Sequence, residues 1–138
     1  MDELDSLKSS LSSKRSQLSA KQQERARYLG VANEIDAVYQ RMVADKRTIR
    51  GYRDSVNSFY KEKYDRFCGN LYKNTYLASI KQLISDYDTV INKLDANMDR
   101  LNTAKAQWEN KAYQCDGVIG YLRSAVNSLV RQIENWVN

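Results

Sequence analysis

An unbroken apolar repeat runs from Leu77 to Trp136, LASIKQLISDYDTVINKLDANMDRLNTAKAQWENKAYQCDGVIGYLRSAVNSLVRQIENW. Alternating steps of three and four residues pick out 18 positions, of which 17 are apolar and Lys105 is the exception. Such a repeat keeps side chains on one stripe of an α-helix and forms a seam against a second helix. The phase continues without a skip across Asp116-Gly117, so the sequence predicts one long helix. The positions are Leu77, Ile80, Ile84, Tyr87, Ile91, Leu94, Met98, Leu101, Lys105, Trp108, Ala112, Cys115, Ile119, Leu122, Val126, Leu129, Ile133 and Trp136.

The first half of the chain carries the same repeat, interrupted by basic residues. Thirteen of its 19 seam positions are apolar, and the other six are all Lys or Arg. These side chains can lay their methylene stems along a seam while the charge reaches water. We expect the bases also to select an acidic partner and to set its register. The apolar positions are Leu4, Leu7, Leu11, Leu18, Tyr28, Ala32, Ile35, Tyr39, Met42, Ile49, Val56, Tyr60 and Phe67, and the basic ones are Lys14, Lys21, Arg25, Lys46, Arg53 and Lys63.

The best candidate for a turn lies between the two halves, at Phe67-Cys68-Gly69-Asn70. Gly69 and Asn70 accept backbone angles that other residues resist. The sequence therefore predicts an all-α fold, a single helical domain over residues 1–138 that forms a long antiparallel, coiled-coil-like hairpin. Its first arm covers 3–66, its turn 67–70 and its second arm 71–136.

A turn at 67–70 between equal arms pairs residues whose numbers add up to about 138. Trp108 would face Gly30 and Tyr87 would face Gly51, which pairs large side chains with missing ones. The alternative is a three- or four-helix bundle with extra helix breaks near Gly51 and Gly117.

The composition argues against an enzyme and against a metal or cofactor site. The chain has no histidine, no proline, five glycines and two cysteines in 138 residues. Histidine is the commonest acid–base catalyst, and glycine-rich loops are the usual phosphate cradles. With no histidine and with Cys68 far along the chain from Cys115, no set of metal ligands emerges. Cys115 lies on the seam and is expected to be a small core residue.

The sequence predicts neither a membrane span nor a signal peptide. Its longest uncharged runs are about seven residues, far short of the roughly 20 that a spanning helix needs. The start MDELDSLKSS lacks a basic region followed by an apolar one. Two cysteines form no disulfide framework, which favours a reducing compartment. We expect a cytoplasmic protein, or one that is exported together with its partner.

Nucleic-acid binding is a less favoured alternative. The net charge of +5 allows an anionic partner without requiring one. Residues 41–66 hold eight bases and four acids, with aromatic residues between them. Interspersed acids are typical of a solvated helix face rather than of a groove for single strands.

Aromatic residues near the turn widen the apolar face beyond what two helices can cover. Both phenylalanines and five of the ten tyrosines lie between Tyr52 and Tyr76. A contiguous exposed aromatic face usually marks an interaction surface. The alternative is that these side chains cap the end of the hairpin or pack on a folded-back helix. The predicted partner-binding residues are Tyr52, Phe59, Tyr60, Tyr64, Phe67, Tyr72 and Tyr76, with Trp108 and Trp136 as seam anchors.

A difference in apolar content between facing stretches of the two arms predicts further exposed apolar surface. Residues 19–27 of the first arm contain only two apolar residues, both alanines. The opposite stretch of the second arm includes Ala112, Cys115, Val118 and Ile119. The hairpin is therefore expected to leave apolar side chains uncovered here too.

Three features together resemble a group of bacterial proteins. They are a Ser-, Lys- and Gln-rich helix start (SSLSSKRSQLSAKQQE, 9–24), an aromatic-x-Gly at the turn (Phe67-Cys68-Gly69) and INKLDANMDRL (91–101) in a long second helix. The chain resembles the small helical partner proteins of LXG-type toxins in type VII secretion, relatives of the WXG helical hairpins. It departs from the WXG pattern in having Phe67 where that pattern has tryptophan.

The resemblance implies pairing with the helical N-terminal domain of a toxin, sometimes with a second small partner, in a bundle competent for export. A Tyr-x-x-x-Asp/Glu export tail is not found near the C-terminus, because Tyr113 is followed by Gly117 and Tyr121 by Ala125. The resemblance then implies a chain that uses a partner's export signal or acts as an intracellular targeting chaperone.

The sequence thus predicts a non-enzymatic protein that binds another helical protein by side-by-side packing, as a toxin-associated secretion partner. The alternative is a structural coiled-coil scaffold or tether that forms homodimers through the same stripe.

Overall fold

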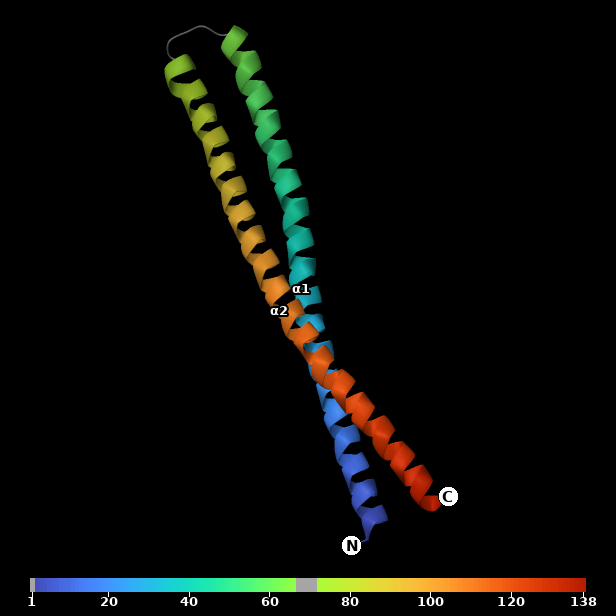
Figure 1. Ribbon diagram of the computed structural model, residues 1–138. Helices are drawn as coiled ribbons and strands as arrows, with labels where there is room; N and C mark the ends of the chain where they lie inside the picture. Colours follow the sequence, from blue (N-terminus) through green and yellow to red (C-terminus); the bar gives the residue numbers. More distant parts are fainter. Residues whose placement is uncertain (1, 67–71) are drawn as a thin grey trace. The chain divides into compact units, whose positions relative to one another are not determined.

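The computed structural model describes residues 2–66 and 72–138, without the side chains of residues 63–66 and 72–74. It contains two long helices, α1 (Glu3–Arg66) and α2 (Ala78–Val137), and a short π-helix, η1 (Tyr72–Leu77), that leads into α2. The helices pack against each other in opposite directions (Figure 1), so the predicted all-α helical hairpin is confirmed. The described residues form no strand. The turn predicted at Phe67, Gly69 and Asn70 lies outside them.

Helix ends follow local signals. Asp2 accepts a hydrogen bond from the backbone N–H of Asp5 at 2.8 Å, which caps the start of α1. The acids Glu3 and Asp5 in the first turn oppose the positive end of the helix dipole. At the start of the second arm, the π-helix ends at Leu77, the buried residue with which the regular apolar repeat begins.

The glycines do not interrupt the helices. Gly51 lies inside α1 and Gly117 inside α2, so the alternative bundle with breaks at these residues is wrong. The seam keeps the same phase on both sides of each glycine, and burial along that seam outweighs the roughly 1 kcal/mol that glycine costs a helix. A Cβ built at Gly30 or Gly51 would meet nothing within 4 Å. The predicted packing of Trp108 on Gly30 and of Tyr87 on Gly51 is therefore wrong, because these glycines face away from any neighbour.

The chain forms two compact units. Unit 1 consists of Met1–Glu34 with Ala104–Asn138, and unit 2 of Ile35–Thr103. We label the seam positions a and d, with Arg25 at a and Tyr28 at d in α1, and Leu77 at a and Ile80 at d in η1 and α2. Positions e and g then flank the seam, one on each side, and c lies next to g.

The predicted seam is the packed surface in both units. All 17 described seam side chains of the first arm, the basic ones included, are buried or half-buried. In the second arm 17 of 18 are buried or half-buried, and Trp136 is the exception with 49% of its surface exposed. Half of the Trp136 side chain is thus not packed in the seam of the hairpin.

One register relates α1 and α2 in each unit. Arg25 binds Asp116 at 2.6 Å in unit 1, and in unit 2 Lys46 binds Asp95 at 2.5 Å and Arg53 binds Asp88 at 3.0 Å. The two residue numbers of each pair add up to 141. Each pair joins a base at position a of α1 to an acid at position e of α2. Three seam bases thus bind the chain's own second helix. Selection of an acidic partner by basic residues along the first arm stays a prediction.

Candidate functional site

The two sides of the seam can be told apart from the residues that line grooves in unit 1. One groove is lined by the e residues Gln22, Leu29, Asp116 and Arg123 of both helices. A groove on the other side contains the g residues Glu24 of α1 and Lys111 of α2, with Gln114 at position c. The e residues of both helices therefore share one side, and the g and c residues share the other, as expected for an antiparallel pair.

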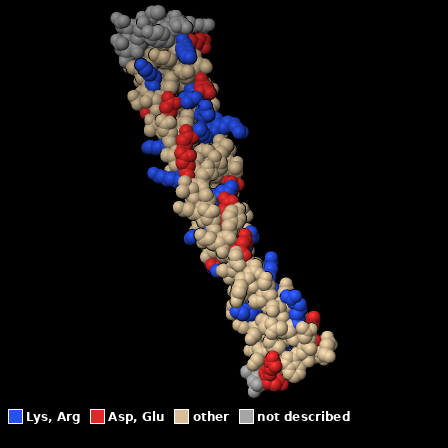
Figure 2. All heavy atoms as spheres, in the orientation of Figure 1, with Lys and Arg blue, Asp and Glu red and all other residues tan. Residues whose placement is uncertain are grey.

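In unit 2 the e side is charged and largely neutralised. Lys46 and Arg53 bind Asp95 and Asp88 there, and Arg53 also binds Asp54 at 2.9 Å. These acids raise the pKa of the Arg53 guanidinium, Asp54 contributing more than Asp88. Lys, Arg, Asp and Glu alternate on the face shown in Figure 2. This pattern differs from the continuous basic groove that binds single-stranded nucleic acid.

The g side of unit 2 is apolar. Tyr52 and Phe59 occupy successive g positions of α1, and three further apolar residues occupy successive g positions of the second arm. Their exposed fractions lie between 38% for Phe59 and 58% for Tyr52. We call this surface the apolar face; its residues are Tyr52, Phe59, Tyr76, Leu83 and Val90. Heptad spacing within each helix and one register between the helices place all five on the same side.

Sequence reasoning found part of this face and missed part. Tyr52, Phe59 and Tyr76 were predicted as partner-binding residues, and their exposure excludes that they pack under a folded-back helix. Tyr60 is half-buried on the seam, one position away from the face. Phe67 and the side chains of Tyr64 and Tyr72 lie outside the described residues, so their role stays a prediction.

Leu83 and Val90 were missed because each stands among polar residues and off the seam. Their spacing of seven and fourteen residues from Tyr76 is the signal that could have found them, because it repeats one helix position.

Trp108 lies in unit 1 and packs inside the hairpin. Its ring centroid is 5.7 Å from that of Tyr28, with the planes tilted by 45°, and the Lys111 ammonium lies 4.2 Å from its centroid. These contacts agree with an anchor of the hairpin's own seam. Trp136 is far from the apolar face in sequence and belongs to the other unit.

The apolar surplus predicted near Ala112, Cys115, Val118 and Ile119 is confirmed only at Val118, which is 43% exposed, because the other three residues are buried. Seam residues of α1 cover them. Lys14, Lys21 and Arg25 are half-buried, and Lys21 and Tyr28 line one groove with Cys115. Long basic side chains bury their methylene stems in this way while the charged ends reach water. The prediction that Cys115 is a core residue is confirmed.

A three-residue network on α1 holds these covering side chains in place. The Tyr28 hydroxyl donates to Glu24 at 2.7 Å, and the Lys21 ammonium donates to the other oxygen of Glu24 at 3.1 Å. These two bonds, the one from Tyr28 first, lower the pKa of Glu24. The bond to Glu24 raises the pKa of Tyr28 and, together with the negative charge of Glu24, raises the pKa of Lys21.

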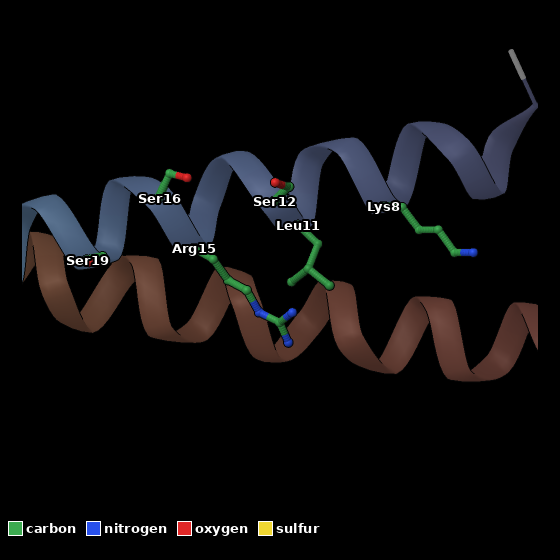
Figure 3. A pocket seen from close by; sticks show the side chains of 6 residues that line it. All are labelled: Lys8, Leu11, Ser12, Arg15, Ser16 and Ser19. Atoms are coloured by element: carbon green, nitrogen blue, oxygen red, sulfur yellow. The ribbon is translucent and has the colours of Figure 1, made fainter.

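The grooves of unit 1 differ in the side chains that line them. One in unit 1 is lined by Lys8, Leu11, Ser12, Arg15, Ser16 and Ser19. Leu11 points toward α2, whereas Ser12 and Ser16 lie on the opposite side of α1 (Figure 3). The lining of this groove includes no carboxylate or imidazole that could activate these hydroxyls as a general base. Among the described residues, no group of three or more Cys, Asp or Glu side chains is arranged to hold a metal ion, and no helix has the length and apolar character of a membrane span.

Comparisons with protein families, with curated proteins and with solved structures give no match for this chain. The resemblance to partner proteins of LXG toxins therefore stays a prediction.

Proposed function

We propose that this chain is a non-enzymatic helical binding protein that packs against the helical N-terminal domain of an LXG-type toxin and helps its type VII export as a chaperone or targeting partner. The observation that carries binding is the apolar face. Five large apolar side chains are exposed in one contiguous arrangement, a pattern that marks interaction surfaces in soluble proteins. The identity of the partner rests on the sequence resemblance.

The mechanism is burial of apolar side chains along a helix. Each of Tyr52, Phe59 and Leu83 gains up to about 1.5–3 kcal/mol when it is fully buried, before the costs of ordering and association. The charged e side opposite is engaged within the hairpin, so binding through the g side leaves the internal ion pairs intact.

The test is co-expression of the chain with N-terminal domains of LXG toxins encoded beside it, followed by co-purification and mass measurement in solution. The proposal expects a stable heteromeric complex. The double variant Phe59→Ala/Leu83→Ala should weaken it at least tenfold, equivalent to about 1.4 kcal/mol. Tyr113→Ala is the matched control, since Tyr113 is as exposed but lies in unit 1, outside the apolar face.

Two results would overturn the proposal. The first is a complex that both variants weaken equally. The second is a homodimer that buries the apolar face and does not exchange for any toxin domain, which would support the self-associating scaffold instead.

A further inference from the structure

The side of unit 2 that carries the apolar face becomes basic beyond Val90. Arg41, Lys93 and Arg100 occupy c positions there, next to g on the same side, and all three are exposed. None of the three forms an ion pair with another described residue, in contrast to Lys46 and Arg53 of the e side. Three uncompensated bases at one end of an apolar stripe form an asymmetric surface.

The acids on this side lie elsewhere, with one exception. Asp86 and Glu62 occupy c positions alongside the apolar face, and Gln82 donates a hydrogen bond to Asp86 at 3.0 Å. Asp45 at position g is the acid nearest the three bases. The basic end therefore has an excess of two positive charges, three bases against one acid.

We infer that the apolar face and this basic end form one docking surface for a single amphipathic helix of the partner. This inference rests on the proposed function. The partner helix carries an apolar stripe of about two heptads, because Tyr76 to Val90 spans 14 residues, about 21 Å of helix. Acidic side chains follow that stripe and meet Arg41, Lys93 and Arg100. Charge complementarity of this kind fixes the register of the bound helix and raises its association rate. Most of the affinity comes from burial of the apolar stripe.

A second copy of the chain does not supply this complement. Its own apolar face continues into the same three bases, whereas the surface calls for an apolar stripe that continues into acids. Two copies aligned in the same direction would bring their bases together, and charges of like sign disfavour that arrangement.

The experiment uses the full chain and two synthetic amphipathic helices of about 28 residues, each with two heptads of a leucine stripe. In one peptide the next two heptads present Glu, and in the other they present Lys at the same positions. Both are also made with the two halves exchanged, so that either helix direction is sampled. Binding is measured by fluorescence anisotropy at low ionic strength, where exposed charges are least screened.

The inference expects the Glu peptide to bind at least tenfold tighter than the Lys peptide in one or both directions. The triple variant Arg41→Ser/Lys93→Ser/Arg100→Ser should reduce that ratio below about threefold, and Leu83→Glu should abolish binding of both peptides. The matched control is Lys8→Ser/Arg15→Ser/Arg131→Ser, which removes three exposed bases of unit 1 and changes the net charge equally. Val90→Glu repeats the Leu83 test if Leu83→Glu lowers helicity.

Equal affinities for the two peptides, or an equal effect of the two triple variants, would overturn the inference. A toxin domain that binds the unit 2 triple variant as well as the unaltered chain would also overturn it while leaving the proposed function in place. Charge-dependent peptide binding without binding of any toxin domain would instead overturn the proposed function alone.

Discussion

Unit 1 scatters its exposed apolar side chains over several heptad positions, whereas unit 2 gathers them on one face. Of the seven buried apolar residues in the described part of the chain, five belong to unit 1 (Ala32, Ala112, Cys115, Ile119 and Leu122) and two to unit 2 (Leu77 and Ile91). Among the side chains that the structure describes, each unit also exposes five large apolar ones. In unit 2 all five share position g, whereas in unit 1 they are spread over five different heptad positions.

The difference shows that the number of exposed apolar side chains matters less than their placement. The exposed residues of unit 1 (Tyr113, Val118, Tyr121, Trp136 and Val137) all belong to one helix, and only Val118 and Tyr121 lie on the same side of it. Apolar side chains exposed singly or in small groups are common on protein surfaces. Tyr121 is also engaged, since the Lys14 ammonium lies 5.8 Å from its ring centroid. The apolar face of unit 2 draws on both helices and can bury its residues together.

The largest expected effect is the difference in unfolding free energy between truncating a buried leucine and truncating an exposed one. Leu122 in unit 1 is 4% exposed, and Leu83 in unit 2 is 43% exposed. Leu122→Ala should lower the free energy of unfolding by about 2–4 kcal/mol through lost burial and a residual cavity. Leu83→Ala should change it by less than about 0.5 kcal/mol. Urea unfolding followed by far-ultraviolet circular dichroism measures both. Equal losses would mean that Leu83 is covered in solution, and the contrast between the units would fail.

The second effect is a gain in stability from Gly→Ala changes. It tests whether the outer faces of the helices are exposed to solvent in both units. A Cβ at Gly117 in unit 1 or at Gly51 in unit 2 meets nothing within 4 Å. Because both glycines lie in helix interiors, Gly117→Ala and Gly51→Ala should each stabilise the fold by about 0.5–1 kcal/mol. The thermal unfolding midpoint of each variant measures the gain. A loss at Gly51 with a gain at Gly117 would indicate that another surface packs on the outer face of unit 2.

A smaller effect is expected from the ion pairs that set the register. The single change Lys46→Asp places two acids side by side and should destabilise unit 2. The double change Lys46→Asp/Asp95→Lys reverses the pair and should restore most of the lost stability. The coupling should be about 0.2–1 kcal/mol, as for other exposed pairs, and should shrink in high salt. The pair Arg25–Asp116 of unit 1 gives the matched double-mutant cycle. Absence of coupling in both cycles would show that the pairs do not define the register.

The sequence allowed the hairpin to be predicted because its decisive signal is long and redundant. Seventeen apolar residues in 18 seam positions between Leu77 and Trp136 leave one helix phase, and a single glycine cannot outweigh it. The side-by-side packing of α1 and α2 follows from the matching stripe in the first arm. Even the basic seam positions of that arm, such as Lys14 and Lys46, were correctly placed, because they keep the phase of their apolar neighbours.

The candidate site could be predicted only in part, for two physical reasons. First, Lys21 and Arg25 count as polar by residue type, although their stems cover Cys115 and Ile119, so the apolar surplus of unit 1 was overestimated. Second, Leu83 and Val90 form a surface with Tyr52 only through the register between the helices. That register is carried by ion pairs such as Arg53–Asp88, which the apolar repeat does not specify.

The smallest effect concerns pH and belongs to the network that covers the core of unit 1. Folding lowers the pKa of Glu24 below its ordinary value of 4.5, mainly through the hydrogen bond from Tyr28 and then through the one from Lys21. The stability that this network adds is therefore present above pH 4.5 and is lost as the pH falls through the lowered pKa of the folded state. Glu24→Gln should lower the melting temperature at pH 7 and should differ little from the unaltered chain at pH 2–3. Tyr28→Phe keeps the ring that packs on Trp108 but removes the stronger of the two bonds, so it should flatten the acid dependence more than Lys21→Met does. If Lys21→Met had the larger effect, the ammonium rather than the phenol would be the main partner of Glu24, and the cover over Cys115 would depend on charge instead of on a neutral hydrogen bond.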